Sequence, residues 1–297
     1  MKRAFIGLAM LLMFQLAAIS QSHNYQGKII ESLSFESKIL KRSVNYSVYL
    51  PFDYDYSNKK YPVLYLLHGR TGNETDWPRS GRIQFLFENA LINGEVPEMV
   101  IIMPAAENTY YINDYKGEVR YEDMFFQELI PTLEQKYRII GNKDNRVISG
   151  LSMGGYGALV YATHHPEMFK TCVALSAAVR TEKTIQEIES DNWNKWFSPM
   201  YPGTTGQSRV SNHWRKNSPI NIIHTAAIDQ IKTVKFMIDC GDDDELDEAN
   251  FALHREMRNL GIEHEFTIRD GHHDWMYWRK GMAEGLKFIG FYIMGGW

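Results

Sequence analysis

Apolar stretches bounded by turn residues recur along the chain, and their patterns predict the strands of a sheet. Residues 44–51 alternate between apolar and polar positions, as expected for a strand with one buried face. Five later stretches are almost continuously apolar, which is typical of strands covered on both faces. These stretches are residues 62–67, 99–103, 146–149, 171–175 and 234–239.

Helical periodicity lies between these strands, in residues 122–137, 154–165 and 246–260. A further strand at 265–268 precedes a final helix with one apolar face, formed by Trp278, Met282, Leu286, Ile289 and Ile293. Strands that alternate with helices predict an α/β fold. We expect a mainly parallel central sheet with helices on both faces and an antiparallel edge from the N-terminal region.

One segment, at about residues 180–231, lacks this rhythm. It contains little periodicity but holds Trp193, Trp196 and Trp214 among Pro, Gly, Ser and Asn residues. An irregular stretch of this length inside a compact domain is usually functional. We therefore predict a lid-like insertion that walls a substrate pocket, in preference to a surface insertion with a small core of its own.

The first twenty residues have the organisation of a secretory signal peptide. Lys2 and Arg3 precede an apolar run over residues 4–19, and small residues at Ala18 and Ser20 suit a cleavage site. A retained anchor is the alternative, although the run is short for a membrane span. Residues 1–20 are thus predicted to be removed, which leaves a single catalytic domain at 21–297 that is secreted or periplasmic and not inserted in a membrane.

Charge and cysteine content exclude some classes of protein. The formal net charge is −4, with basic residues scattered among acidic ones. No basic stripe is available to neutralise phosphates, so nucleic acid is not an expected partner. The two cysteines, Cys172 and Cys240, lie in apolar strand-like runs. Export permits a disulfide, but two buried thiols are the preferred interpretation.

Candidate chemistry begins at Ser152. The sequence Gly150-Leu-Ser-Met-Gly154 follows one predicted strand and opens directly into a helical segment. A serine on such a sharp strand-to-helix turn is typical of a nucleophile elbow. The glycines suit this position because side chains there would collide with the neighbouring strand and helix.

A serine nucleophile needs a base and a group that orients the base, and the chain offers both in the expected order. Asp242, Asp243 and Asp244 follow the strand at 234–239, and an adjacent histidine pair follows the strand at 265–268. The acids could also be a solvated helix start. They lack the ligand spacing of a calcium loop, so no metal is expected. No organic cofactor is required either.

Together these motifs resemble the esterase D-like branch of the α/β-hydrolases, and the resemblance extends from about Val44 to the C-terminus. That branch includes the feruloyl and acetylxylan esterases of carbohydrate esterase family 1 and the tributyrin-type esterases. The resemblance rests on Leu64–Gly69, Gly72–Trp77, Gly150–Leu159, Cys240-Gly241 with Asp244 and Leu246, and His273–Trp278.

The resemblance implies a role for individual residues. Ser152 resembles the nucleophile, Asp244 the acid and His273 the base, while the backbone N–H groups of Arg70 and Met153 resemble the oxyanion donors. His272 stands where the family commonly has glycine, and His273 is expected in preference to it as the base.

The expected substrate follows from export and aromatic content. Some esterases hydrolyse thioesters in the cytosol, and an exported esterase does not suit that role. The remaining class of substrate is esters carried on polymers. Trp193, Trp196, Trp214, Tyr110 and Tyr111 are candidate substrate contacts because aromatic planes stack on feruloyl rings and sugar faces. We expect removal of feruloyl or acetyl groups from plant cell-wall xylan, a feruloylated or acetylated polysaccharide or oligosaccharide. The alternatives are a broad short-chain carboxylesterase and a non-catalytic carbohydrate-binding module.

Overall fold

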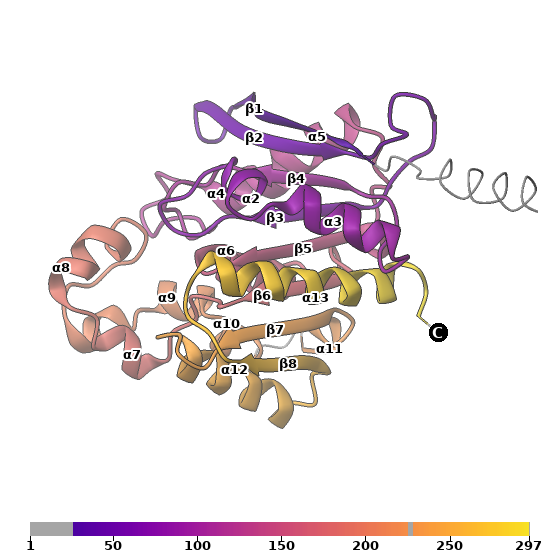
Figure 1. Cartoon of the computed structure of the whole chain (residues 1–297). Helices are drawn as coiled ribbons and strands as arrows, with labels where there is room; N and C mark the ends of the chain where they lie inside the picture. Colours follow the sequence, from indigo (N-terminus) through magenta and orange to yellow (C-terminus); the bar gives the residue numbers. More distant parts are fainter. Residues whose placement is uncertain (1–25, 225–227, 297) are drawn as a thin grey trace, which may run out of the picture.

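Eight strands form one mixed sheet in the order β1-β2-β4-β3-β5-β6-β7-β8 (Figure 1). The computed structural model describes residues 26–224 and 228–296, and the predicted signal peptide at 1–20 lies outside this part of the chain. The strands are β1 (Lys28–Ser37), β2 (Arg42–Leu50), β3 (Val63–Leu67), β4 (Val100–Pro104), β5 (Arg146–Leu151), β6 (Thr171–Leu175), β7 (Lys235–Gly241) and β8 (His264–Arg269).

The sheet is parallel from β4 to β8 and antiparallel at its N-terminal edge. β1 pairs antiparallel with β2, and β2 pairs antiparallel with β4. The remaining neighbours are parallel, with β3 between β4 and β5. This arrangement confirms the predicted α/β fold with a mainly parallel sheet. It also places the C-terminal ends of β3, β5, β6, β7 and β8 at one edge, where binding sites of such sheets lie.

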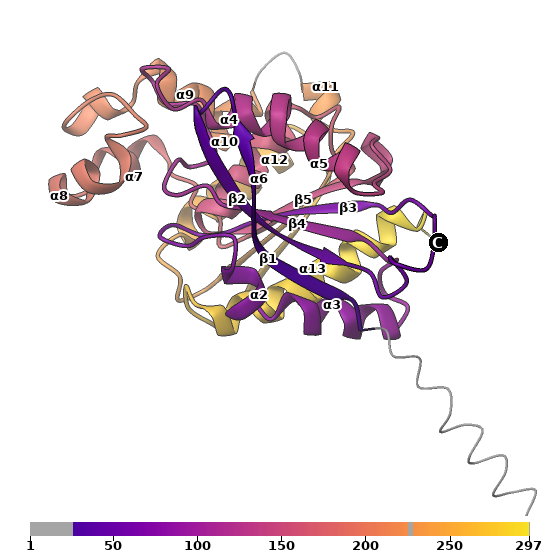
Figure 2. The same cartoon turned by 90° about the horizontal axis from the view of Figure 1, so that it is seen from above.

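Helices cover both faces of the sheet (Figure 2). One face carries α2 (Asp76–Arg79), α3 (Ile83–Ile92) and α13 (Trp275–Ile293), and the other carries the remaining long helices. The opposite layer consists of α4 (Tyr121–Met124), the π-helical turn η1 (Phe125–Leu129), α5 (Ile130–Lys136), α6 (Met153–His164) and α12 (Asp247–Asn259). A short 3₁₀ turn, η2 (Lys143–Asn145), leads into β5.

The central strands explain why the helices pack on both sides. Every residue of β3, β4, β5 and β6 is buried, so both faces of these strands must be covered. Two hydrophobic clusters result, one on each face of the sheet. Figure 2 shows α13 lying along the same face as α3, and Leu286 and Phe87 belong to the cluster on that face.

The segment between β6 and β7 contains short helices that its sequence pattern does not reveal. These are α7 (Glu182–Gln186), α8 (Ser190–Asn192), the π-helical turn η3 (Trp193–Phe197), the 3₁₀ turn η4 (Gly206–Arg209), α9 (Asn212–Asn217), α10 (Pro219–Ile222) and α11 (Ile228–Ile231). We call residues 180–231 the insertion. In Figures 1 and 2, α7 and α8 project beyond the edge of the sheet.

The two cysteines do not form a disulfide. Cys172 and Cys240 are buried free thiols, as expected from the sequence. Among the helices in the described part of the chain, none combines the length and apolar character that a membrane span requires.

Candidate active site

Ser152 lies at the turn between β5 and α6, where the chain reverses sharply. Its backbone has φ 53° and ψ −117°, a strained conformation for a residue with a side chain. A Cβ on Gly150 would lie 2.4 Å from the backbone of Gly154, and a Cβ on Gly154 would lie 2.4 Å from the Leu67 carbonyl oxygen. The predicted need for glycine at both positions is therefore steric, because strand and helix meet here without room for side chains.

Two hydrogen bonds connect Ser152 to a histidine and a carboxylate from distant loops. His273 Nε2 lies 2.8 Å from Ser152 Oγ, and His273 Nδ1 lies 2.8 Å from Asp244 Oδ2. Asp244 follows β7 and His273 precedes α13, so the sheet edge brings together residues 121 positions apart. The structure thus unites the three side chains that the sequence nominated.

The Asp244 carboxylate is fully buried yet held in its charged form. Burial alone would raise its pKa, but the hydrogen bond from His273 and its charge outweigh that effect, and the pKa of Asp244 is lowered. Its other oxygen accepts a hydrogen bond from the backbone N–H of Leu246 at 3.0 Å. A carboxylate fixed in this way orients the imidazole and favours a positive charge on it.

The neighbouring histidine and acids do not share this arrangement. The side chain of His272 is 69% exposed and lies 3.7 Å from Asp243, which is itself exposed. Asp242 Oδ1 instead accepts a hydrogen bond from the Gly271 backbone at 3.1 Å. Asp242, Asp243 and Asp270 form an exposed acidic group at the surface. Of the two histidines, only His273 therefore reaches Ser152, and of the three acids, only Asp244 reaches His273.

The backbone N–H groups of Arg70 and Met153 have no protein acceptor within the residues that the structure describes. Met153 is the first residue of α6, where N–H groups lack partners in the helix. The Arg70 loop is fixed by the buried His68, whose Nδ1 donates to the Gly69 carbonyl at 2.7 Å and whose Nε2 accepts from Ala106 N–H at 2.9 Å. Burial lowers the pKa of His68 to about 4, so it stays neutral and serves as a loop anchor.

Ser152 opens into a pocket of about 450 Å³ at this edge of the sheet. Of the aromatic residues nominated from the sequence, Trp196 lines this pocket and supplies one wall. The lining residues are Gly69, Arg70, Thr71, Gly72, Asp76, Leu151, Ser152, Trp196, His273, Asp274, Trp275 and Trp278.

The other aromatic candidates are placed elsewhere, which corrects the expected set of substrate contacts. Trp193 is fully buried inside the insertion, stacked on Phe197 with ring centroids 5.6 Å apart. Tyr111 is also fully buried and donates a hydrogen bond from its hydroxyl to the His68 carbonyl. Tyr110 and Trp214 are 3% exposed and belong to the packing behind the pocket. Their rings are used for packing, so they are not free to stack a ligand beside Ser152.

Trp275 and Trp278 line the pocket, although sequence reasoning did not assign them to it. Trp278 was assigned to the buried face of the last helix, and its ring meets His273 edge-on with centroids 4.9 Å apart. The available signal was their place in the first turn of α13, directly after the histidine loop. Side chains in a first turn face the same sheet edge as the loop before it.

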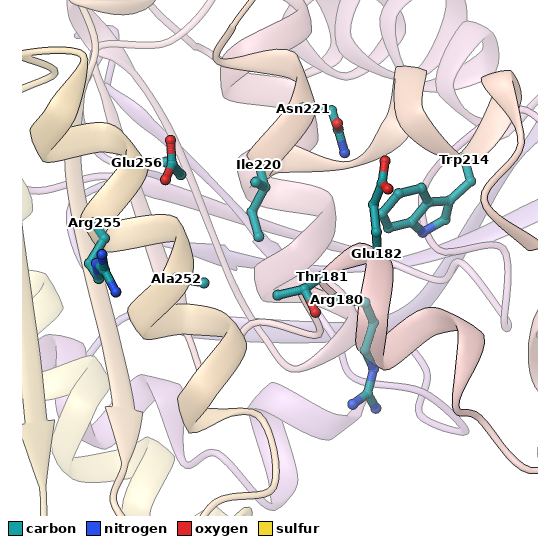
Figure 3. Close-up of a pocket in the computed structure, with 9 residues that line it drawn as sticks. All are labelled: Arg180, Thr181, Glu182, Trp214, Ile220, Asn221, Ala252, Arg255 and Glu256. Atoms are coloured by element: carbon teal, nitrogen blue, oxygen red, sulfur yellow. The ribbon is translucent and has the colours of Figure 1, made fainter. Parts of the chain in front are cut away.

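A second pocket of about 330 Å³ lies between the insertion and α12 (Figure 3). Its lining includes Trp214, Asn221 and Arg255, but not Ser152 or His273. Arg180 also borders it, and Figure 3 shows the Arg180 guanidinium pointing away from the other labelled side chains. This pocket is therefore separate from the cavity that Ser152 faces.

Comparison with known proteins decides the family. The family model named Esterase matches residues 37–289. The chain belongs to this esterase family. The α/β-hydrolase fold and the family named from the sequence motifs are thereby confirmed, and the protein is a serine carboxylic ester hydrolase.

The esterase is also similar to individual proteins of known activity. An acetyl esterase from Caldicellulosiruptor saccharolyticus is 28% identical over 88% of this chain and 97% of that protein. An endo-1,4-beta-xylanase/feruloyl esterase from Xylanibacter ruminicola is 30% identical over 53% of this chain, but the match spans only 23% of that longer protein.

Solved structures give the same picture. A ferulic acid esterase superposes with a TM-score of 0.79 at 32% identity, covering 91% of this chain and 100% of that one. The ferulic acid esterase from Anaeromyces mucronatus has a TM-score of 0.67 at 20% identity, covering 93% of this chain and 94% of that one. The second likeness concerns the fold alone.

Proposed function

We propose that this esterase removes feruloyl or acetyl groups from plant cell-wall xylan through an acyl-enzyme formed on Ser152. The observation that carries the proposal is the pair of 2.8 Å hydrogen bonds that joins Ser152 to His273 and His273 to Asp244 at the pocket floor. These side chains supply proton transfer and a nucleophile, so the reaction needs no metal or organic cofactor.

The mechanism follows from the geometry. His273 Nε2 removes the proton from Ser152 Oγ as that oxygen attacks the ester carbonyl, and Asp244 stabilises the resulting imidazolium. The backbone N–H groups of Arg70 and Met153 donate to the negative carbonyl oxygen. Collapse of the tetrahedral species breaks the bond to the alcohol, which leaves with the proton from His273. Water then attacks the acyl-enzyme while His273 takes a proton from it. Collapse of this second tetrahedral species releases the carboxylic acid and returns the proton from His273 to Ser152 Oγ.

The substrate is supported by the pocket wall and by the relatives. Trp196, Trp275 and Trp278 offer aromatic surface of the kind that accepts a feruloyl ring or a sugar face. The relatives include proteins named acetyl esterase and xylanase/feruloyl esterase. Both names describe release of small acyl groups.

A substrate panel tests this proposal. Initial rates are measured on methyl ferulate, acetylated xylan and short-chain 4-nitrophenyl esters with increasing acyl length. We expect turnover of methyl ferulate or acetylated xylan. Rates that are high on short 4-nitrophenyl esters and absent on both of the others would instead indicate a broad short-chain carboxylesterase. No turnover on any of the three would contradict the proposal.

Export is the second part of the proposal. Lys2, Arg3 and the apolar run at residues 4–19 support a signal peptide, and polymer-borne esters lie outside the cell. The N-terminal sequence of the protein recovered from a secreting host is expected to begin at Gln21. Recovery of the chain only in the cytosol with its first twenty residues intact would contradict export.

A further inference from the structure

The Arg70 side chain is a cation without a counter-ion at the mouth of the Ser152 pocket. Its guanidinium carbon lies 4.6 Å from the ring centroid of Trp196, and both side chains line the pocket. Within residues 26–224 and 228–296, no carboxylate oxygen lies within the 4.0 Å that defines an ion pair with Arg70. An arginine beside a reacting centre with no protein carboxylate to bind is available to a ligand.

The Trp196 ring also attracts this guanidinium. A guanidinium attracted to an aromatic ring offers its planar face to the ring, while its N–H donors lie in its own plane. The Tyr110 hydroxyl oxygen accepts a hydrogen bond from Arg70, and the other N–H donors of the guanidinium remain for a ligand. The fork geometry of a guanidinium matches a carboxylate with two parallel hydrogen bonds.

Two further cations, Lys195 and Arg180, add positive charge in the neighbourhood of Trp196 and Arg70. Lys195 Nζ lies 4.5 Å from the same Trp196 ring centroid. Arg180 is close enough to sense the Arg70 charge: burial lowers the pKa of Arg180, and the positive charge of Arg70 lowers it further against the opposing effects of Glu245, Tyr110 and Asp244. The Arg180 ion pair is with the exposed Glu245, at 3.9 Å.

The direction of Arg180 agrees with this placement. Figure 3 shows its guanidinium turned away from the second pocket, and the groups that it senses include Tyr110 and Arg70. Tyr110 in turn senses both arginines, which oppose the rise in its pKa caused by burial. Tyr110 and Arg180 line one small cavity, and the charges of Arg70 and Arg180 both act on Tyr110.

The acids of the pocket do not neutralise this field by direct contact. Asp274 accepts a hydrogen bond from the Tyr277 backbone N–H at 2.9 Å and caps α13. Burial raises the pKa of Asp76, which disfavours its charged form. Neither carboxylate lies within ion-pair distance of Arg70.

We propose that the pocket selects esters that carry a carboxylate near the scissile bond, with Arg70 binding that carboxylate directly and Arg180 and Lys195 adding longer-range attraction. This inference rests on the proposed function, because the selected group is part of the ester that Ser152 attacks. The carboxylate can belong to the acyl group, as in a dicarboxylic half-ester, or to the alcohol, as in an acetylated uronic acid.

Matched substrate pairs separate these two sources. For the acyl side, the pair is mono-4-nitrophenyl succinate and its neutral methyl ester. For the alcohol side, the pair is an acetylated methyl glucuronide and the corresponding acetylated methyl glucoside. The measured quantity is the ratio of kcat/KM for the charged member to that for the neutral member, which cancels general effects on catalysis.

We expect the wild-type enzyme to prefer the charged member of at least one pair by about tenfold or more, since hydrogen bonds to charged groups have this value. Arg70→Gln keeps the backbone N–H but removes the charge, and it should abolish most of the preference. Arg70→Lys should keep part of it, because an ammonium retains the charge but not the fork. The preference should also weaken as salt is added.

Arg215→Gln is the matched control. Arg215 is an exposed arginine on α9 that pairs with Glu182 at 2.9 Å, and it does not line the Ser152 pocket. This variant changes the net charge by the same amount, so it should leave the ratio unchanged. Covalent labelling of each variant by a fluorophosphonate checks that Ser152 remains reactive and the fold intact.

The outcomes distinguish failure of the carboxylate preference from failure of the proposed esterase function. A preference in the acyl pair alone identifies an acidic acyl group, and a preference in the alcohol pair alone identifies a uronate. Hydrolysis of the neutral esters with no preference in either pair, or a preference that Arg70→Gln leaves unchanged, would overturn this inference while the proposed function stands. Hydrolysis of none of the four esters would count against the proposed function itself.

Discussion

The Ser152 site and the insertion lie next to each other but are stabilised in different ways. The site combines loops that follow β5, β7 and β8, and its short hydrogen bonds join residues 121 positions apart in the sequence. The insertion is built from local turns and short helices. Its central side chain is Arg209, which is 2% exposed and lies with its guanidinium carbon 4.7 Å from the Trp193 ring centroid.

This difference indicates that the sheet and the insertion have separate roles. The sheet determines where the reacting groups lie, because buried strands leave little freedom to the residues that follow them. The insertion contributes Trp196 to the pocket wall from one of its short helical turns. Changes in the site should therefore affect turnover of all esters, whereas changes in the insertion should affect stability and substrate choice.

Replacement of His273 should give the largest effect. His273→Gln removes the base from Ser152, and loss of the base in a serine hydrolase lowers kcat by roughly 10⁶-fold. Steady-state kinetics on a 4-nitrophenyl ester measure it. His272→Gln is the matched control, because His272 is exposed and does not reach Ser152. Comparable losses in the two variants would show that the base has been misassigned.

Replacement of Asp244 comes next. Asp244→Asn keeps the shape of the side chain but removes the charge that orients His273, and such a change lowers kcat by about 10⁴-fold. The same measurement on Asp243→Asn should give a rate near that of the wild type, since the Asp243 side chain is 57% exposed. Equal rates for both variants would leave Asp244 without a special role.

A variant of Arg209 tests the role of the insertion in stability and substrate choice. The Arg209 guanidinium donates to the carbonyl oxygens of Thr204, Gln186 and Ile188. Arg209→Met removes the hydrogen bonds that the buried guanidinium makes to these three carbonyl oxygens, and we expect the free energy of unfolding to fall by about 3 kcal/mol.

Urea denaturation measures this loss, and Arg215→Met provides an exposed control. The kinetic consequence should depend on substrate. kcat/KM for methyl ferulate should fall more than kcat/KM for 4-nitrophenyl acetate, which needs little of the pocket wall. An equal decrease for both esters would contradict the separate roles of sheet and insertion.

The smallest expected effect concerns a pH-dependent link between α6 and the insertion. His164 Nδ1 lies 2.8 Å from Glu122 Oε1, and His164 Nε2 lies 2.8 Å from the Lys216 carbonyl oxygen. Both partners are acceptors, so the imidazole must donate twice and carry a positive charge. Burial opposes this charge, but the hydrogen bond to Glu122 and its charge raise the pKa of His164 above 6.5.

Because this pKa is raised in the folded protein, the stabilisation is complete below the unfolded value and is lost as pH rises through the folded value. The difference in unfolding free energy between wild type and His164→Gln should therefore shrink by about 1 kcal/mol between about pH 6 and about pH 9. Urea denaturation at a series of pH values checks this. A difference that grows with pH would contradict the assigned charge state.

The stabilisation contributed by Glu122 should depend on pH in the opposite direction to that of His164. Burial opposes its ionisation, but hydrogen bonds from His164 and His165 lower the pKa of Glu122 to about 2. Its contribution is thus present above the unfolded value of 4.5 and is lost as pH falls toward about 2.

The sequence was sufficient to predict strands β2 to β8 and the sheet edge at which the reacting side chains meet, for a physical reason. Ser152, Asp244 and His273 each lie just after a strand of a parallel sheet or in the loop that follows one, and such positions meet at one edge. The choice of Asp244 among adjacent acids, and of His273 over His272, came from the family motif. Neither choice follows from residue type or spacing.

Other elements could not be predicted because their signals are interrupted or too short. The alternation of β1 is broken by a bulge between Ile30 and Leu33, where Ser32 has φ 54°. The helices of the insertion have three to six residues, which is too short to show a helical period.

Substrate contacts were the least predictable feature. Trp193 and Trp196 are three residues apart in the same π-helical turn, yet one packs inside the insertion and the other lines the Ser152 pocket. Each ring has an arginine beside it, and what separates them is the burial of Trp193, which no local pattern reveals. Secretion is still a prediction from the first twenty residues.

The central claim is that Ser152 is the nucleophile activated at this sheet edge. Intact-mass analysis after treatment with a fluorophosphonate tests it directly. The account predicts one covalent adduct on the wild-type protein, located by peptide mapping to Ser152, and none on Ser152→Ala. Equal labelling of the two proteins would contradict it.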